Sequence, residues 1–285
     1  MGAPPPVGDR TLLFVGGLHR SGTTALARCL AAHPRVSGFA ATGEKEDEGQ
    51  HLQSVYPSAR QYGGAGRFAH TSLPHLTEGS PLATPENARR LVEGWAPYWD
   101  LDRPVLLEKS PPNLVMTRFL QALFPDARFV MMVRHPVVVT LSTHRWRGRT
   151  SYAKLLEHWF SAHDRFRADA PHIRNLCVVK YEELVADPPT TLARVGSFLR
   201  LDGDVPASSL QTHRSDTYQR QWAALIARAP WQRIAITRLL NRYEERAREY
   251  GYSLRDLSWT QPFTVPGCGA ADAPVESPGH PPPPA

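Results

Sequence analysis

The sequence predicts an α/β fold in which a central, mostly parallel sheet is flanked by helices on both faces. Short apolar runs alternate with segments of helical periodicity along the chain, which is the pattern of parallel-sheet proteins. The run at 128–133 is apolar on both faces, as in a strand buried between two helical layers. The chain has 285 residues, 41% of them apolar, and we predict that 11–260 form a single domain.

The first two strand–helix units come from the N-terminal half of the chain. A strand is predicted at 11–15, where Gly16 and Gly17 close an apolar run and a helical pattern follows over 24–32. A second strand is predicted at 105–107, and the apolar positions that follow it have helical spacing up to Leu123.

Two further units follow in the C-terminal half. The third strand is predicted at 128–133, and Pro136 begins the helix after it because proline suits the first helical position. The fourth strand is predicted at 176–179 and leads to a helix around 192–199. Because all four strands precede helices, we expect ligands at the carboxyl ends of the strands.

The stretch 39–99 fits this alternation less well. It is rich in Gly, His, Ser and Pro, and we predict an irregular insertion near the ligand site with one helix at 85–99, capped by Thr84. Helical periodicity at 231–250 predicts a solvated C-terminal helix.

Composition limits the class of protein and the ends of the chain. Residues 1–10 and the tail 261–285, which has eight prolines, are expected to be disordered.

A formal net charge of +6 permits a nucleic-acid partner, but the arginines are dispersed and no nucleic-acid-binding signature is present, so we predict no nucleic-acid partner. No apolar run approaches a membrane span and no secretion signal is visible, so we expect a cytoplasmic protein with no membrane partner. Its three cysteines lack a framework spacing, and its histidines lack ligand spacing, which predicts no bound metal.

A glycine-rich segment connects the first strand to the first helix, where backbone N–H groups and the helix N-terminus can bind an anion. The spacing Gly-x-x-x-x-Gly at 17–22 is that of a phosphate-binding P-loop, so the fold class is a P-loop-type three-layer fold. A nucleotide triphosphatase needs Lys at the position of Thr23, and no Asp follows the third strand, which disfavours the alternative of a small-molecule kinase. The predicted anion-binding residues are His19, Arg20, Ser21, Gly22, Thr23 and Thr24.

A second anion-binding pair follows the third strand. Arg134 ends that strand, and Ser142 lies eight residues later on the next helix, within one or two helical turns. A guanidinium and a hydroxyl together can bind a terminal phosphate monoester.

With these motifs in order, the sequence resembles the sulfotransferases that use 3′-phosphoadenosine 5′-phosphosulfate (PAPS) as co-substrate. The resemblance spans about residues 11–200 and is nearest to the branch that contains tyrosylprotein and many bacterial sulfotransferases. It implies that Arg20 to Thr24 bind the 5′-phosphosulfate and that Arg134 and Ser142 bind the 3′-phosphate. The other shared motifs are His33-Pro34, Glu108-Lys109-Ser110-Pro111, 124–129 and 180–184.

The resemblance implies transfer of a sulfuryl group to a hydroxyl of a small-molecule or carbohydrate acceptor. Arg20 and Lys109 would stabilise negative charge on the leaving group and the sulfuryl group. Relatives place a glutamate base shortly after His-Pro, but that stretch here has no acid, and the candidates come slightly later. We expect Glu48 first, then Glu46 and His51.

Two further expectations concern a late segment and the tryptophans. Tyr218 and Arg220 are placed where relatives return a loop over the cofactor, and either can contact its adenine or 3′-phosphate. Four tryptophans are candidates for the acceptor pocket, core packing being the alternative: Trp95, Trp99, Trp146 and Trp159. A non-catalytic nucleotide-binding protein remains an alternative function, and the sequence leaves the oligomeric state open.

Overall fold

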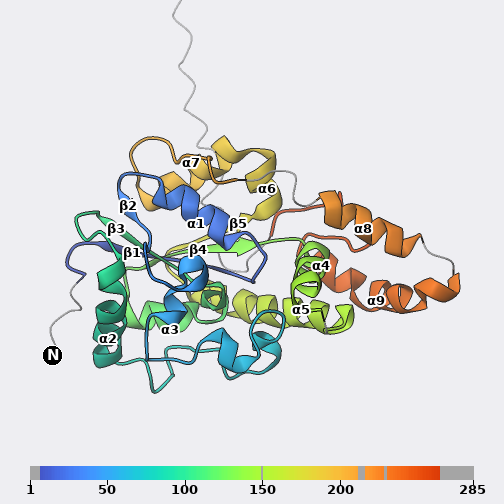
Figure 1. Ribbon diagram of the computed structural model, residues 1–285, viewed down its shortest axis with the longest axis horizontal. Coiled ribbons are helices and arrows are strands. Elements are labelled where there is room, and N and C mark those ends of the chain that lie inside the picture. The colour runs from blue at the N-terminus through green and yellow to red at the C-terminus, as the bar shows by residue number, and fades with distance from the viewer. Residues whose placement is uncertain (1–6, 149, 211–215, 228–229, 264–285) are drawn as a thin grey trace, which may run out of the picture.

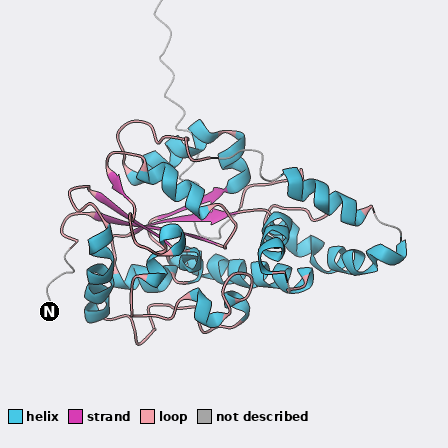
Figure 2. Ribbon diagram, in the orientation of Figure 1, coloured by secondary structure: helices cyan, strands magenta, loops and turns pink. Residues whose placement is uncertain are grey.

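The structure is a computed structural model that describes residues 7–148, 150–210, 216–227 and 230–263. At its centre is a five-stranded sheet in which all strand pairs are parallel, in the order β2-β3-β1-β4-β5 (Figures 1 and 2). The strands are β1 (Thr11–Gly17), β2 (Val36–Ser37), β3 (Val105–Lys109), β4 (Arg128–Val133) and β5 (Leu176–Lys180). The predicted α/β fold with a central parallel sheet is confirmed. The two-residue β2 was not predicted.

Helices cover both faces of the sheet (Figure 2). Alternate side chains of β1 point to opposite faces, as the strand period requires: Leu13 packs with α1 and α7, whereas Phe14 packs with the opposite layer. The helices are α1 (Thr23–Ala31), α2 (Pro85–Trp95), α3 (Thr117–Leu123), α4 (Pro136–Arg147), α5 (Tyr152–Asp169), α6 (Tyr181–Ala186), α7 (Pro188–Leu199), α8 (Asp216–Ile226) and α9 (Pro230–Glu249).

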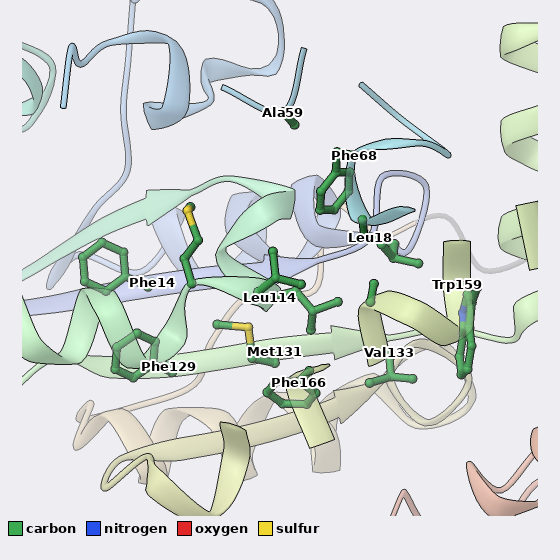
Figure 3. Packing of buried hydrophobic residues seen from close by; sticks show 14 of the residues in the cluster. Phe14, Leu18, Ala59, Phe68, Leu114, Phe129, Met131, Val133, Trp159 and Phe166 are labelled. Carbon is green, nitrogen blue, oxygen red and sulfur yellow. The ribbon is translucent and has the colours of Figure 1, made fainter. Parts of the chain in front are cut away.

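The larger core lies between the sheet and the layer that contains α5 (Figure 3). Phe14 of β1 stacks on Phe129 of β4 at 5.6 Å between ring centroids, and Trp159 and Phe166 of α5 are fully buried against this layer. Helix α5 was missed by the sequence analysis. Its apolar stripe is interrupted by buried His158, His163 and Asp169, which blurs the helical pattern.

The insertion 39–99 consists of loops and short 3-10 turns with one α-helix, α2. Thr84 caps it, as predicted, by accepting a hydrogen bond from the Asn87 N–H at 3.2 Å. The α-helix ends at Trp95 rather than at residue 99, because Pro97 has no N–H to continue the ladder, and a 3-10 turn follows. Trp95 and Trp99 are core residues, and each indole donates to a backbone carbonyl.

The C-terminal segments differ from the sequence predictions. Helix α9 is not simply solvated, because one of its faces is buried in the core through Leu240, Tyr243 and Ala247. Phe263, which we had assigned to the tail, stacks on Phe166 with 6.2 Å between centroids. The rest of the predicted tail, 264–285, lies outside the described residues.

The N-terminal end of the chain also differs from the sequence prediction. Val7 is buried in the core, and Arg10 donates its backbone N–H to the carbonyl of Val7, although 1–10 was predicted to be disordered. Residues 1–6 lie outside the described part of the chain. Within the described ranges no helix is long and apolar enough to cross a membrane.

Candidate active site

A cleft of about 1340 Å³ opens where β1 and β4 end and α1 begins. This is the edge at which parallel sheets bind ligands. Most of the residues that the sequence analysis selected line it: His19, Arg20, Gly22, Thr23, Thr24, Glu46, Glu48, His51, Arg134, Ser142 and Tyr218. Three others do not line it. Ser21 is a buried residue of the loop between β1 and α1, and Lys109 is buried in contact with Glu48. Arg220 is exposed on α8.

The loop between β1 and α1 has the shape of an anion-binding site. Gly22 precedes α1 with φ of 105°, and a Cβ there would lie 2.5 Å from Cδ2 of Tyr181, so only glycine fits. Ser21 is buried, and within the described part of the chain its Oγ has no hydrogen-bond partner. The first N–H groups of α1 have no carbonyl within the helix to bond. The loop therefore offers the N–H groups at the start of α1 to an anion in the cleft, whereas the Ser21 hydroxyl is buried against Gly17.

Arg20 connects the two predicted anion-binding motifs. Its Nε donates to Ser142 Oγ at 2.9 Å, and its carbonyl accepts from Nη1 of Arg134 at 3.0 Å. The Tyr218 hydroxyl also donates to Ser142 Oγ, at 3.2 Å. Tyr218 is in the first turns of α8, a helix, and not in a loop as the resemblance implied. The two motifs thus meet at one place, with Arg20 between Arg134 and Ser142.

Arg134 is held in a nearly dry environment. Its guanidinium lies 3.7 Å from the ring centroid of Tyr181, and its carbonyl accepts from the Trp159 indole at 3.0 Å. Burial lowers the pKa of Arg134 from its usual value, which is the cost of removing a cation from water. A phosphate at this point would accept charge-assisted hydrogen bonds from the guanidinium.

The predicted base lies on the other side of the cleft. Glu48 is 8% exposed, and its Oε1 lies 3.4 Å from Lys109 Nζ, whose side chain is also buried. The Lys109 ammonium donates in addition to the carbonyl of Glu46, at 2.5 Å. Glu46 contributes its carbonyl to this contact while its side chain is exposed, and His51 Nε2 lies 3.8 Å from Glu48 Oε2. Of the three candidate bases, Glu48 is the one whose carboxylate is buried beside a cation.

A buried carboxyl lies beneath Glu48. Burial raises the pKa of Glu108 to about 7, although Ser110 and Asn113 both donate to its carboxylate. The sequence analysis noted Glu108 only as part of a motif. Its position directly after the apolar run of β3, on a strand whose residues are all buried, is the signal that could have identified it as an unusual carboxyl.

His19 and Trp146 form an aromatic wall of the cleft, with 6.4 Å between their ring centroids. Burial, with a smaller contribution from Lys109, lowers the pKa of His19 to about 3, so its imidazole is neutral. Trp146 is 50% exposed and is the one of the four candidate tryptophans that lines the cleft. Trp159, like Trp95 and Trp99, is buried in the core.

Several cleft residues were not found by the sequence analysis. Tyr181 was quoted only within a motif, yet it touches both Gly22 and Arg134. Arg28 and Arg145 extend the positive lining from α1 and α4. Arg28 is one helical turn after Thr24, and Arg145 is one turn after Ser142. This spacing could have identified both arginines as residues of the site. Within the described ranges no group of three or more His, Cys, Asp or Glu could hold a metal ion.

Comparison with known proteins identifies the family. The model of the sulfotransferase family matches residues 13–205. A protein-tyrosine sulfotransferase of Drosophila melanogaster is 27% identical over 219 residues, which are 73% of this chain and 41% of the relative. Protein-tyrosine sulfotransferase 2 of Gallus gallus is 27% identical over 199 residues, 67% of this chain and 51% of the relative. This chain thus spans about half the length of these two relatives.

Among solved structures, the sulfotransferase domain of the Synechococcus PCC 7002 olefin synthase matches with a TM-score of 0.48 and 21% identity, over 76% of this chain and 81% of that one. The family match covers well over half of the chain and includes the anion-binding loop, Glu48, Arg134 and Ser142. The chain belongs to the sulfotransferase family, as the order of its motifs predicted.

Proposed function

We propose that this protein transfers a sulfuryl group from PAPS to the hydroxyl of an acceptor. One observation carries the proposal: the Arg20 side chain bonds Ser142 while its carbonyl bonds Arg134, so two strand ends and one helix start converge on one anion site. Glu48, a buried carboxylate, lines the same cleft. Family membership agrees with this arrangement.

The residues present fit the co-substrate. Arg20, Thr23, Thr24 and the N-terminus of α1, which follows the glycine turn at Gly22, would hold the 5′-phosphosulfate. Arg134 and Ser142 would hold the 3′-phosphate. When bound, PAPS supplies the sulfuryl group and a phosphate leaving group.

The residues of this chain divide the remaining work. Glu48 takes the proton of the acceptor hydroxyl while the hydroxyl oxygen forms a bond to sulfur. At the same time the bond between sulfur and the 5′-phosphate oxygen breaks. Arg20 and the loop N–H groups stabilise the negative charge that builds on the leaving oxygen. Lys109 contacts Glu48, so the Lys109 ammonium orients the carboxylate of the base and stabilises its negative charge. The products are a sulfate ester and 3′-phosphoadenosine 5′-phosphate.

The acceptor is proposed from the relatives and from the cleft wall. The relatives are named protein-tyrosine sulfotransferases, which favours a tyrosyl hydroxyl. The half-exposed Trp146 beside His19 offers a flat apolar face on which an aromatic or sugar ring can stack. A small-molecule or carbohydrate hydroxyl is therefore the second candidate.

The test is isothermal titration calorimetry with 3′-phosphoadenosine 5′-phosphate, beside ATP with Mg²⁺. We expect the bisphosphate to bind and Arg134→Ala to weaken it by about 10–100-fold, because a charge-assisted contact is lost. Arg174→Ala is the matched control. Arg174 is an exposed arginine just before β5, at the opposite edge of the sheet.

Each result has a defined meaning. Preference for ATP with Mg²⁺ would replace the proposal with the small-molecule kinase. Bisphosphate binding would justify an assay of labelled sulfuryl transfer to a tyrosyl peptide, a small phenol and a sugar. Bisphosphate binding without transfer to any of them would favour the non-catalytic nucleotide-binding protein.

A further inference from the structure

Gln50 is an amide buried next to the proposed base. It is 2% exposed, and its Nε2 donates to Glu48 Oε2 at 2.5 Å. Its Oε1 accepts from the Ala59 N–H at 2.8 Å, and its own N–H donates to Ser110 Oγ at 2.9 Å. Its carbonyl accepts from the Gln53 side chain at 3.2 Å. Every polar group of Gln50 is thus bonded within the protein.

These contacts fix the direction of the amide. A backbone N–H can only donate, so the group that faces Ala59 must be the carbonyl oxygen of Gln50. The NH₂ group must therefore face Glu48. An N–H at this point offers no lone pair to a proton on Oε2 of Glu48, so the contact is suited to the carboxylate form.

The segment that carries Gln50 is attached to the end of β3. Ser110 accepts from Gln50 and donates to the buried carboxylate of Glu108, which also accepts from Asn113. A Cβ on Gly49 would lie 2.5 Å from Glu108 Oε1, so the backbone at 49 lies directly on that carboxyl. Strand β3 therefore positions Gln50.

The same strand end approaches Glu48 from the other side. Lys109 lies 3.4 Å from Glu48 Oε1 while Gln50 holds Oε2, so both oxygens of the carboxylate are held. The titratable groups that the structure places around Glu48 are Lys109 and Glu108 from β3 and His51 from its own turn.

We infer that Gln50 is a positioning residue that holds the Glu48 carboxylate in the orientation in which it accepts a proton. The inference rests on the proposed function, in which Glu48 is the base. It adds a residue that does not line the cleft and whose effect on the reaction passes through Glu48.

The main variant is Gln50→Glu, which keeps the size of the side chain and the acceptor for Ala59. It replaces the N–H donor with a second carboxylate oxygen that faces Glu48, and two carboxylates at one site share a proton. We expect the acid limb of the pH profile of kcat/KM to move up by about one pH unit or more. Binding of 3′-phosphoadenosine 5′-phosphate should be unchanged.

The control is Gln53→Glu, because Gln53 lies in the same loop and makes four hydrogen bonds of its own, none of them to Glu48. This variant disturbs the loop to a similar degree and should leave the acid limb in place. If Gln50→Glu does not fold, Gln50→Met removes the donor at similar volume. We expect it to lower kcat by about 10–100-fold, with bisphosphate binding retained.

A second readout needs no acceptor. Side-chain carboxyl ¹³C NMR of glutamate-labelled protein, with the Glu48 signal assigned by its loss in Glu48→Gln, follows the titration of Glu48 directly. A higher midpoint in Gln50→Glu, but not in Gln53→Glu, supports the inference. An unchanged midpoint, or an equal shift in both variants, overturns it. Failure of the wild-type protein to bind the bisphosphate would instead overturn the proposed function.

Discussion

Acidification should destabilise this fold through four histidines that burial keeps neutral: His19, His135, His158 and His163. His135, His158 and His163 are each 3% exposed or less. Burial lowers the pKa of His135 to about 3 and that of His163 to about 4, and it lowers the pKa of His158 well below the usual value. Each histidine therefore stays neutral in the folded protein and takes up a proton only when the chain unfolds. Its contribution to stability is present above about pH 6.5 and is lost as the pH falls below that value.

Between about pH 7.5 and about pH 5.5, each histidine removes about 1.4 kcal/mol from the free energy of unfolding. Glu108 acts in the opposite sense, because burial raises its pKa to about 7 in the folded state. Above that pH the buried charge of Glu108 lowers the free energy of unfolding. As the pH falls, Glu108 takes up a proton in the folded state, and the free energy of unfolding rises by about 2 kcal/mol over the same interval. With His19, whose pKa burial also lowers to about 3, four histidines against one carboxyl leave a net loss of about 3.5 kcal/mol.

Urea unfolding at the two pH values measures this difference. His158→Phe, which keeps an aromatic ring in contact with Phe68, should reduce the loss to about 2 kcal/mol. Glu108→Gln removes the opposing group and should increase the loss to about 5.5 kcal/mol. A free energy of unfolding that is unchanged or higher at the lower pH would refute the reasoning, as would a His158→Phe variant with the full wild-type loss.

Three further predictions concern the cleft. Glu48→Gln should bind 3′-phosphoadenosine 5′-phosphate normally but lose about 10²–10⁴-fold in turnover, and unchanged turnover would remove Glu48 from the mechanism. Ser142→Ala deletes the acceptor of the Arg20 hydrogen bond and should weaken the bisphosphate about tenfold by calorimetry; equal affinity would place the 3′-phosphate elsewhere. Gly22→Ala should displace Tyr181 and reduce both thermal stability and bisphosphate affinity. The control is Gly203→Ala. Gly203 has a φ of 83° and no atom lies within 4 Å of an added Cβ, so this variant introduces backbone strain without a steric clash and should leave bisphosphate affinity unchanged.

Much of the fold could be predicted from local patterns. The strands at β1, β3, β4 and β5 are short apolar runs followed by turn residues, and such runs depend little on their neighbours. Helix α5 could not be predicted in this way. Its buried polar residues His158, His163 and Asp169 are compatible with the core only because other elements supply their surroundings, as His75 does when it pairs with Asp169 at 2.7 Å.

The amino-acid sequence is sufficient to place an anion loop, a strand-end arginine and a serine on the next helix at one edge of the sheet, because parallel strands have their carboxyl ends together. The contacts between these residues depend on how the elements pack. Arg20 lies between Arg134 and Ser142, and Tyr181 reaches them because β5 is next to β4. The choice among acids was likewise tertiary. An acidic run looks alike along the chain, and Glu48 is distinguished only by its burial against Lys109, 61 residues away in sequence.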